Sequence, residues 1–143
     1  MIAIGSDHGG YELRQKVMEH LKERGLEYKD FGCPDLSSCD YPIFGEAVAK
    51  AVASGECDRG IVICTTGIGI SIKANKVKGI RCALCGDPVS ARLTREHNDA
   101  NVLAMGAAII GERVALNIVD IFLDTPFSGE EKHQRRVNML ENA

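Results

Sequence analysis

Short apolar runs alternate with segments of helical periodicity along the whole chain. Five runs have the length and composition of strands: 2–5, 26–31, 60–64, 81–85 and 102–105. Apolar residues recur at helical spacing in the intervening segments, at Leu13, Val17 and Leu21, at Ala47, Val48, Ala51 and Val52, and at Val89 and Leu93. This alternation predicts an α/β fold with βαβ crossovers: a Rossmann-like three-layer αβα sandwich around a five-stranded, mainly parallel sheet.

Residue chemistry marks several helix boundaries. Gly25 suits the position just after a helix C-terminus, and Asp40 followed by Pro42 suits a helix start. A helix is also predicted over 112–123, where apolar residues share one face, at Val114, Ile118, Val119 and Phe122.

The last segment, 129–143, is predicted to be a helical tail with little apolar surface. Such a tail is expected to dock on a partner subunit, which favours a homodimer or a tetramer of such dimers; a solvated surface helix fits the pattern nearly as well. Its basic run 132–136 is either a solvated face or an anion contact through Arg136.

The length and charge of the chain narrow the function. Its 143 residues suffice for one domain, 1–143, and are too few for two. A formal net charge of -3 without a basic block argues against nucleic acid or membrane surfaces and favours a small-molecule partner. Because no charged leader or membrane-length apolar run is present, we expect a cytoplasmic location.

The six cysteines are expected to be free thiols, because this is not a small secreted scaffold. Cys82 and Cys85 have the spacing of a zinc or redox pair, but residues three apart on a strand point to opposite faces. No metal site is therefore expected.

The segment 61–73 leads from an apolar strand through Cys64 into a glycine-rich turn and then a helix. The unbonded N–H groups and the macrodipole at such a helix start favour a phosphate or an oxyanion. A cysteine beside it can be partly thiolate and serve as a base or nucleophile. A buried cysteine that simply ends a strand explains the same pattern equally well.

Polar residues follow other strands too. Parallel strands share one carboxyl edge, where ligands bind, so Asp7 and His8 are candidate ligand contacts; Asp7 could instead cap the next helix. His97 lies before the last strand, where Asp99 could orient it. A histidine there can move protons on a sugar hydroxyl, or it is an exposed residue favoured by the helix dipole.

Six motifs occur in order along the chain: Ser6-Asp7-His8-Gly9, Asp40-Tyr41-Pro42, the run 64–72 that starts at Cys64, Ala74-Asn75-Lys76, Gly79-Ile80-Arg81, and His97-Asn98-Asp99-Ala100-Asn101. With them the chain closely resembles type B ribose-5-phosphate isomerase, in the family that also contains galactose-6-phosphate isomerase. The resemblance covers nearly the whole chain and is far more specific than one glycine loop.

The resemblance implies a cofactor-free aldose–ketose isomerase that interconverts ribose 5-phosphate and ribulose 5-phosphate, with active sites across a homodimer. It implies that Cys64 moves the proton between C1 and C2, and that His97 of the partner subunit opens the furanose ring with help from Thr66. Other roles carry over in the same way: the N–H groups of Gly67, Ile68, Gly69 and Ile70 on the enediolate, Asp7, His8 and Asn98 on substrate oxygens, and Lys132 and Arg136 on the phosphate.

Four positions depart from the family pattern. Ile70 replaces the glutamate base that some relatives use, which leaves the base role to Cys64. Thr65 replaces a usual glycine, Ala108 replaces a frequent arginine, and Lys132 replaces another. Since a lysine loses the bidentate fork and an alanine loses the charge, phosphate binding is expected to persist in a weaker or altered form.

Two alternatives remain beside the pentose phosphate isomerase, and the sequence argues against a third. One is isomerisation of a six-carbon aldose, as a 6-phosphate or a free sugar, and another is a sugar-phosphate or nucleotide-binding module without turnover. The third, a cysteine phosphatase, needs an arginine in its Cys-x5-Arg loop, and Ile70 occupies that position.

Overall fold

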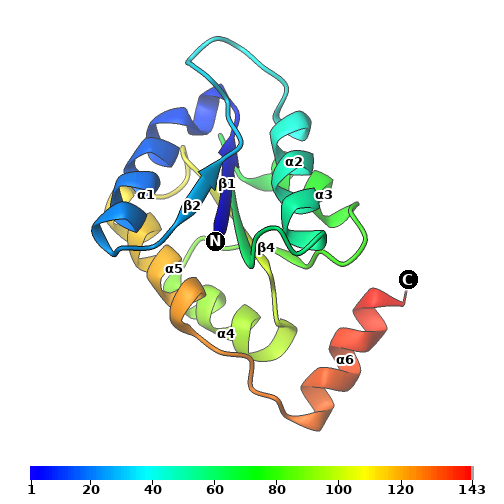
Figure 1. The fold of residues 1–143 in the computed structure, drawn as a ribbon. Helices are drawn as coiled ribbons and strands as arrows, with labels where there is room; N and C mark the ends of the chain where they lie inside the picture. Colours follow the sequence, from blue (N-terminus) through cyan, green and yellow to red (C-terminus); the bar gives the residue numbers. More distant parts are fainter. Residues whose placement is uncertain (143) are drawn as a thin grey trace.

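The computed structural model describes residues 1–142, which form a five-stranded sheet with helices on both faces (Figure 1). The strand order is β2-β1-β3-β5-β4, and every neighbouring pair is parallel. The strands are β1 Ile2–Ser6, β2 Tyr28–Asp30, β3 Arg59–Cys64, β4 Cys82–Leu84 and β5 Val102–Gly106. The predicted three-layer α/β fold is confirmed, and the two edge strands, β2 and β4, are shorter than predicted.

The helices form two layers around this sheet. They are η1 His8–Gly10, α1 Tyr11–Glu23, α2 Tyr41–Ala53, α3 Ile68–Asn75, α4 Pro88–Asn98, α5 Glu112–Asp124 and α6 Glu131–Glu141. Helices α1, α4 and α5 cover one face, and α2 and α3 cover the other. Helix α6 lies outside both layers and packs beside α4 (Figure 1). Within residues 1–142, no helix is long and apolar enough to cross a membrane.

Alternation along the strands divides the core in two. In β3, Ile61 and Ile63 pack with α1 and α5, whereas Val62 and Cys64 point to the α2 and α3 side. The Cys64 thiol therefore faces the layer that contains the glycine turn.

Two helix boundaries follow the predicted chemistry. Gly25 has φ 72° and follows the end of α1, and Asp40 directly precedes α2, although its side chain makes no capping hydrogen bond. The predicted inward face of α4 is wrong, because Val89 is 57% exposed and the helix buries Ala91, Thr94 and Arg95 instead.

The strand order creates a crevice between β1 and β3. From β1 the chain passes to β2 on one side, and from β3 it passes to β4 and β5 on the other. The register pairs Ser6 with Ile63, so the residues that follow the two strands lie side by side. In open α/β sheets, ligands bind at such a topological switch point.

Candidate active site

The thiol of Cys64 lies at the mouth of a tight glycine turn. Cys64 ends β3 and is 5% exposed, and its Sγ accepts a hydrogen bond from the Gly67 N–H over 3.2 Å. Gly67 has φ 78°, and a Cβ there would lie 2.7 Å from the backbone carbon of Met105. Both the left-handed backbone and the close approach to β5 therefore require glycine.

Helix α3 starts immediately after this turn. Its first internal bond runs from the Ser71 N–H to the Gly67 carbonyl over 3.2 Å, and the Ile68 N–H donates to Thr66 Oγ1 over 3.2 Å. The N–H groups of Gly69 and Ile70 precede that first bond and point out of the helix end. The turn thus presents backbone donors to an oxyanion next to the thiol.

Two side chains border the turn. A Cβ at Gly69 would lie 2.5 Å from Cζ of Tyr41, so the Tyr41 ring at the start of α2 covers this glycine. The Thr65 side chain packs against Gly9, whose position has no room for a Cβ beside Thr65 Oγ1. Thr65 therefore narrows the crevice between the ends of β1 and β3.

Asp7 and His8 follow β1 on the other side of the crevice. The Asp7 N–H donates to the Ile63 carbonyl over 3.3 Å, and its carboxylate accepts from the Gly10 N–H over 3.1 Å, so Asp7 does cap the short helix η1. The Cys39 N–H donates to Nδ1 of His8 over 3.2 Å. This bond requires an unprotonated Nδ1, which leaves the neutral ring with its proton on Nε2.

A buried arginine, Arg14, supports this wall and was not predicted from the sequence. It is 1% exposed and donates to Ser6 Oγ over 2.7 Å and to the Cys33 carbonyl. It thereby ties the end of β1 to the loop that carries Cys39, the partner of His8. The sequence held a signal, because Arg14 shares the helical spacing of Val17 and the other inward residues of α1.

The remaining predicted residues form a second group at the other end of the strands, opposite the Cys64 thiol. His97 and Asn98 end α4, whereas Lys132 and Arg136 lie exposed on α6. Helix α4 begins after the carboxyl end of β4 and runs back, so His97 lies at the amino end of the strands. Within one chain, His97 and the Cys64 thiol therefore lie at least the length of a strand apart, about 17 Å.

The contact of His97 differs from the prediction. Asp99 does not orient it, because Asp99 Oδ1 lies 2.8 Å from Nη1 of Arg95 and Oδ2 lies 3.7 Å from Nη2 of Arg81. Arginine is always charged and offers several N–H donors, so Arg95 and Arg81 occupy the carboxylate instead of His97. Instead, the His97 ring contacts the ring of His133 from α6.

A surface cavity of about 500 Å³ is lined in part by Gly9, Lys16 and Ala108. The Ala108 N–H donates to the Thr65 carbonyl over 2.9 Å, which fixes Ala108 beside the turn. A side chain longer than alanine at this position would enter the cavity.

All six cysteines are free thiols, as predicted. Burial, with a smaller contribution from Asp87, raises the pKa of Cys85 to about 11. Within residues 1–142, no group of three or more histidine, cysteine or carboxylate side chains is placed to hold a metal ion.

Comparison with known proteins identifies the family. Residues 2–140 match the family model described as Ribose/Galactose Isomerase. The chain belongs to this family. It is 53% identical over 142 residues to the putative sugar phosphate isomerase YwlF of Bacillus subtilis, covering 99% of this chain and 95% of that protein. It is 48% identical to ribose-5-phosphate isomerase B of Escherichia coli, covering 97% and 93%.

Solved structures of the ribose/galactose isomerase family have the same fold. Ribose-5-phosphate isomerase B of Clostridium thermocellum superposes with a TM-score of 0.97 at 55% identity, covering 99% of this chain and 95% of that one. The protein of Thermotoga maritima superposes with a TM-score of 0.96 at 45% identity, covering 99% and 97%. The resemblance inferred from the six motifs is thereby confirmed.

Proposed function

We propose that this chain is an aldose–ketose isomerase that interconverts ribose 5-phosphate and ribulose 5-phosphate. The observation that carries the proposal is the juxtaposition of the Cys64 thiol with the outward N–H groups of Gly69 and Ile70. The relative from Escherichia coli, named ribose-5-phosphate isomerase B, supports this substrate. The reaction moves protons between neighbouring atoms and consumes no redox cofactor, and we expect it in the cytoplasm.

Cys64 acts as the base of the isomerisation. Its thiolate removes the proton from C2 of the open-chain aldose, the C2 electron pair forms a C1–C2 double bond, and the carbonyl electrons move to O1. The thiol then returns a proton to C1, while O2 loses its proton and O1 gains one. The outward N–H groups of the turn stabilise the enediolate oxygens, and one such donor contributes about 3 kcal/mol.

Ring opening must precede this step, because the sugar phosphate is cyclic in solution. A histidine can remove the proton from the anomeric hydroxyl, and a proton reaches the ring oxygen as the bond to C1 breaks. We assign the assisting role to Thr66, whose exposed side chain lies two residues after Cys64. We assign the histidine role to His97, and since His97 lies at the far edge of its own sheet, it must come from a second copy.

Exposed apolar side chains around the turn support a homodimer. Ile68 is 52% exposed, Leu84 is 44% exposed and Ile109 is 66% exposed, and they surround the glycine turn. On α6, Met139 and Leu140 are 69% and 57% exposed. A second copy that covers these groups would bring the α4 and α6 group to the thiol and remove apolar surface from water.

The phosphate contacts are assigned to the same incoming group. Lys132 and Arg136 extend from exposed positions of α6, where a phosphate ester can reach them. His8 and Asp7 on the wall of the crevice, with Asn98 from the second copy, contact the sugar hydroxyls.

Incubation of ribose 5-phosphate in deuterated water tests the function. We expect ribulose 5-phosphate to accumulate and deuterium to enter C2 of the recovered aldose. Cys64→Ala should abolish both, whereas Cys57→Ala, which removes a buried thiol behind α2, should retain both. A folded wild-type chain that binds the sugar phosphate but gives neither product would indicate a binding module.

A second candidate is a six-carbon aldose phosphate. It is favoured by 43% identity to the galactose-6-phosphate isomerase subunit LacB of Clostridium acetobutylicum, covering 99% of this chain and 82% of that protein. The ratio of kcat/KM for ribose 5-phosphate to that for galactose 6-phosphate decides between them.

A further inference from the structure

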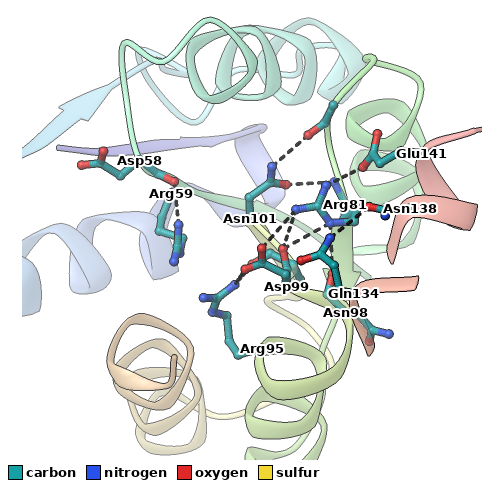
Figure 2. Close-up of polar contacts among 12 residues, drawn as sticks. Asp58, Arg59, Arg81, Arg95, Asn98, Asp99, Asn101, Gln134, Asn138 and Glu141 are labelled. Atoms are coloured by element: carbon teal, nitrogen blue, oxygen red, sulfur yellow. Dashed lines mark hydrogen bonds and ion pairs between the residues drawn. The ribbon is translucent and has the colours of Figure 1, made fainter. Parts of the chain in front are cut away.

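Asn75, Arg81 and Asn101 come from three of the sequence motifs, have no role in the proposed site, and lie at the amino ends of β4 and β5. Figure 2 shows Arg81 and Asn101 there. Asn101 Oδ1 accepts from the Arg81 N–H over 2.8 Å, and Asn101 Nδ2 donates to the Gly79 carbonyl over 2.9 Å. Asn75 bonds the N–H and carbonyl of Cys82 over 2.7 Å and 2.9 Å. The backbone that carries Arg81 is therefore held from both sides.

The Arg81 guanidinium binds the end of α4. Its Nε donates to the Asn98 carbonyl over 3.0 Å and to the Asp99 carbonyl over 3.2 Å, and its Nη2 donates to the Asp99 carbonyl over 2.8 Å. The last carbonyls of a helix have no partner inside it and carry partial negative charge. Arg81 therefore caps the C-terminal end of α4, the helix turn that bears His97.

The backbone at this helix end is unusual. Asp99 has φ 47°, and it is the one non-glycine residue with positive φ among residues 1–142. Such a conformation persists only where surrounding contacts hold it, and Arg81 and Arg95 bind Asp99 from two sides. Without Arg81, the backbone at Asp99 would lose one of the contacts that hold its positive φ, and the last turn of α4 that carries His97 would be less fixed.

Arg81 also reaches α6. Its Nη1 donates to Oε1 of Glu141, and its side chain is 18% exposed (Figure 2). Helix α6 carries His133, which contacts the His97 ring. One guanidinium thus joins the helix that bears His97 to the helix that supports its ring.

We propose that Arg81 is a positioning residue for ring opening by His97. The proposal rests on the proposed function, because it assigns Arg81 a role in only one of the two proton-transfer steps. Cys64 and the turn that stabilises the enediolate lie at the other end of the strands, so the groups that carry out the enediolate step make no contact with Arg81 of the same chain. Displacement of a reacting group by about 1 Å can lower a rate by about 100-fold.

Two measurements separate the steps. The first is net conversion of ribose 5-phosphate, which needs ring opening. The second is deuterium exchange at C1 of ribulose 5-phosphate in deuterated water at saturating substrate, which starts from an open-chain ketose and needs Cys64 and the glycine turn but no ring opening. We expect Arg81→Ala to lower net conversion by about 100-fold and exchange by less than about threefold. His97→Ala should give the same split, and guanidinium ion at non-denaturing concentration should partly restore Arg81→Ala.

Matched variants make the result specific. Arg59 lies at the same edge of the sheet, and its Nη1 donates to the Asp58 carbonyl over 3.0 Å, away from the end of α4 (Figure 2). Arg59→Ala should keep both activities. If Arg81→Ala does not fold, Glu141→Gln and Arg81→Lys, which keep most of the network, should show a smaller split in the same direction.

The outcomes distinguish the two proposals. Equal losses of conversion and exchange in folded Arg81 variants, or unchanged conversion in Arg81→Ala, would overturn the role of Arg81. Retention of both activities in Cys64→Ala would overturn the proposed function whatever Arg81 does.

Discussion

The rings of His97 and His133 lie 4.4 Å apart between centroids, with an angle of 34° between their planes. His133 is itself fixed, because its Nδ1 lies 2.6 Å from Ser128 Oγ and 3.2 Å from Oε2 of Glu130. The tail helix therefore does more than cover the surface: it limits how the His97 ring can turn.

His133→Ala should lower kcat for ribose 5-phosphate by about tenfold, because an unsupported His97 ring samples more orientations. His133→Phe keeps a ring to pack against and should retain most of the activity. His20 on α1, which lies 2.7 Å from Asp120 on α5, supplies the control. Steady-state kinetics of the three variants test the contact, and equal kcat in the alanine and wild-type proteins would contradict it.

Gly67→Ala should destabilise the protein more than Gly129→Ala. Both glycines have positive φ, at 78° and 73°, which costs an alanine about 1–2 kcal/mol. A Cβ at position 129 meets nothing within 4 Å, whereas one at position 67 would approach Met105 and Gly106 within 3 Å. Thermal unfolding of both variants measures the difference, and isomerase assays should show loss of activity for Gly67→Ala alone.

The alkylation of Cys85 should depend steeply on pH. Because burial raises its pKa to about 11, only about one thiol in a thousand is ionised at pH 8. Modification of Cys85 by iodoacetamide at pH 8 should be far slower than that of a free thiol and should rise with pH, since the thiol is buried and only the thiolate reacts. Peptide mass spectrometry measures this rate, and a plateau reached below pH 9 would show that the pKa is not raised.

Ala108→Arg should increase the preference for a phosphorylated sugar. The new guanidinium would enter the cavity beside Gly9 and add a charged donor to the site. We expect KM for ribose 5-phosphate to fall several-fold, with no change for free ribose. Ala108→Gln, of similar reach without charge, is the control, and equal effects of the two substitutions would exclude electrostatic recognition of phosphate.

The sequence was sufficient for the parts of the site that lie within one contiguous segment. The apolar strand, Cys64 and the glycine turn occur within a few residues, so local chemistry predicted a thiol beside a glycine turn and a helix start, and the Gly67 N–H donates to the Cys64 thiol there. The contact between His97 and His133 joins two helices through tertiary packing, and no local pattern indicates it. Asp99 was assigned to the wrong partner although Arg95, four residues earlier, lies at helical ion-pair spacing.

Burial of charged side chains was the other source of error. Helix α4 turns Arg95 and Thr94 inward because Arg95 donates to the Ala100 carbonyl over 2.7 Å and to the Thr125 carbonyl over 3.1 Å. Hydrophobic periodicity assigns an arginine to solvent and therefore placed Val89, which is 57% exposed, on the inward face. Arg14 was missed for the same reason.

Cys64 and His97 lie at opposite ends of the strands of one chain, and this placement has a consequence for mixtures of variants. In the proposed homodimer, Cys64→Ala and His97→Ala inactivate the same sites from different chains. A mixed dimer would then contain one site with both defects and one intact site. Two inactive proteins, unfolded together and refolded, should therefore recover about a quarter of wild-type activity if the chains pair at random.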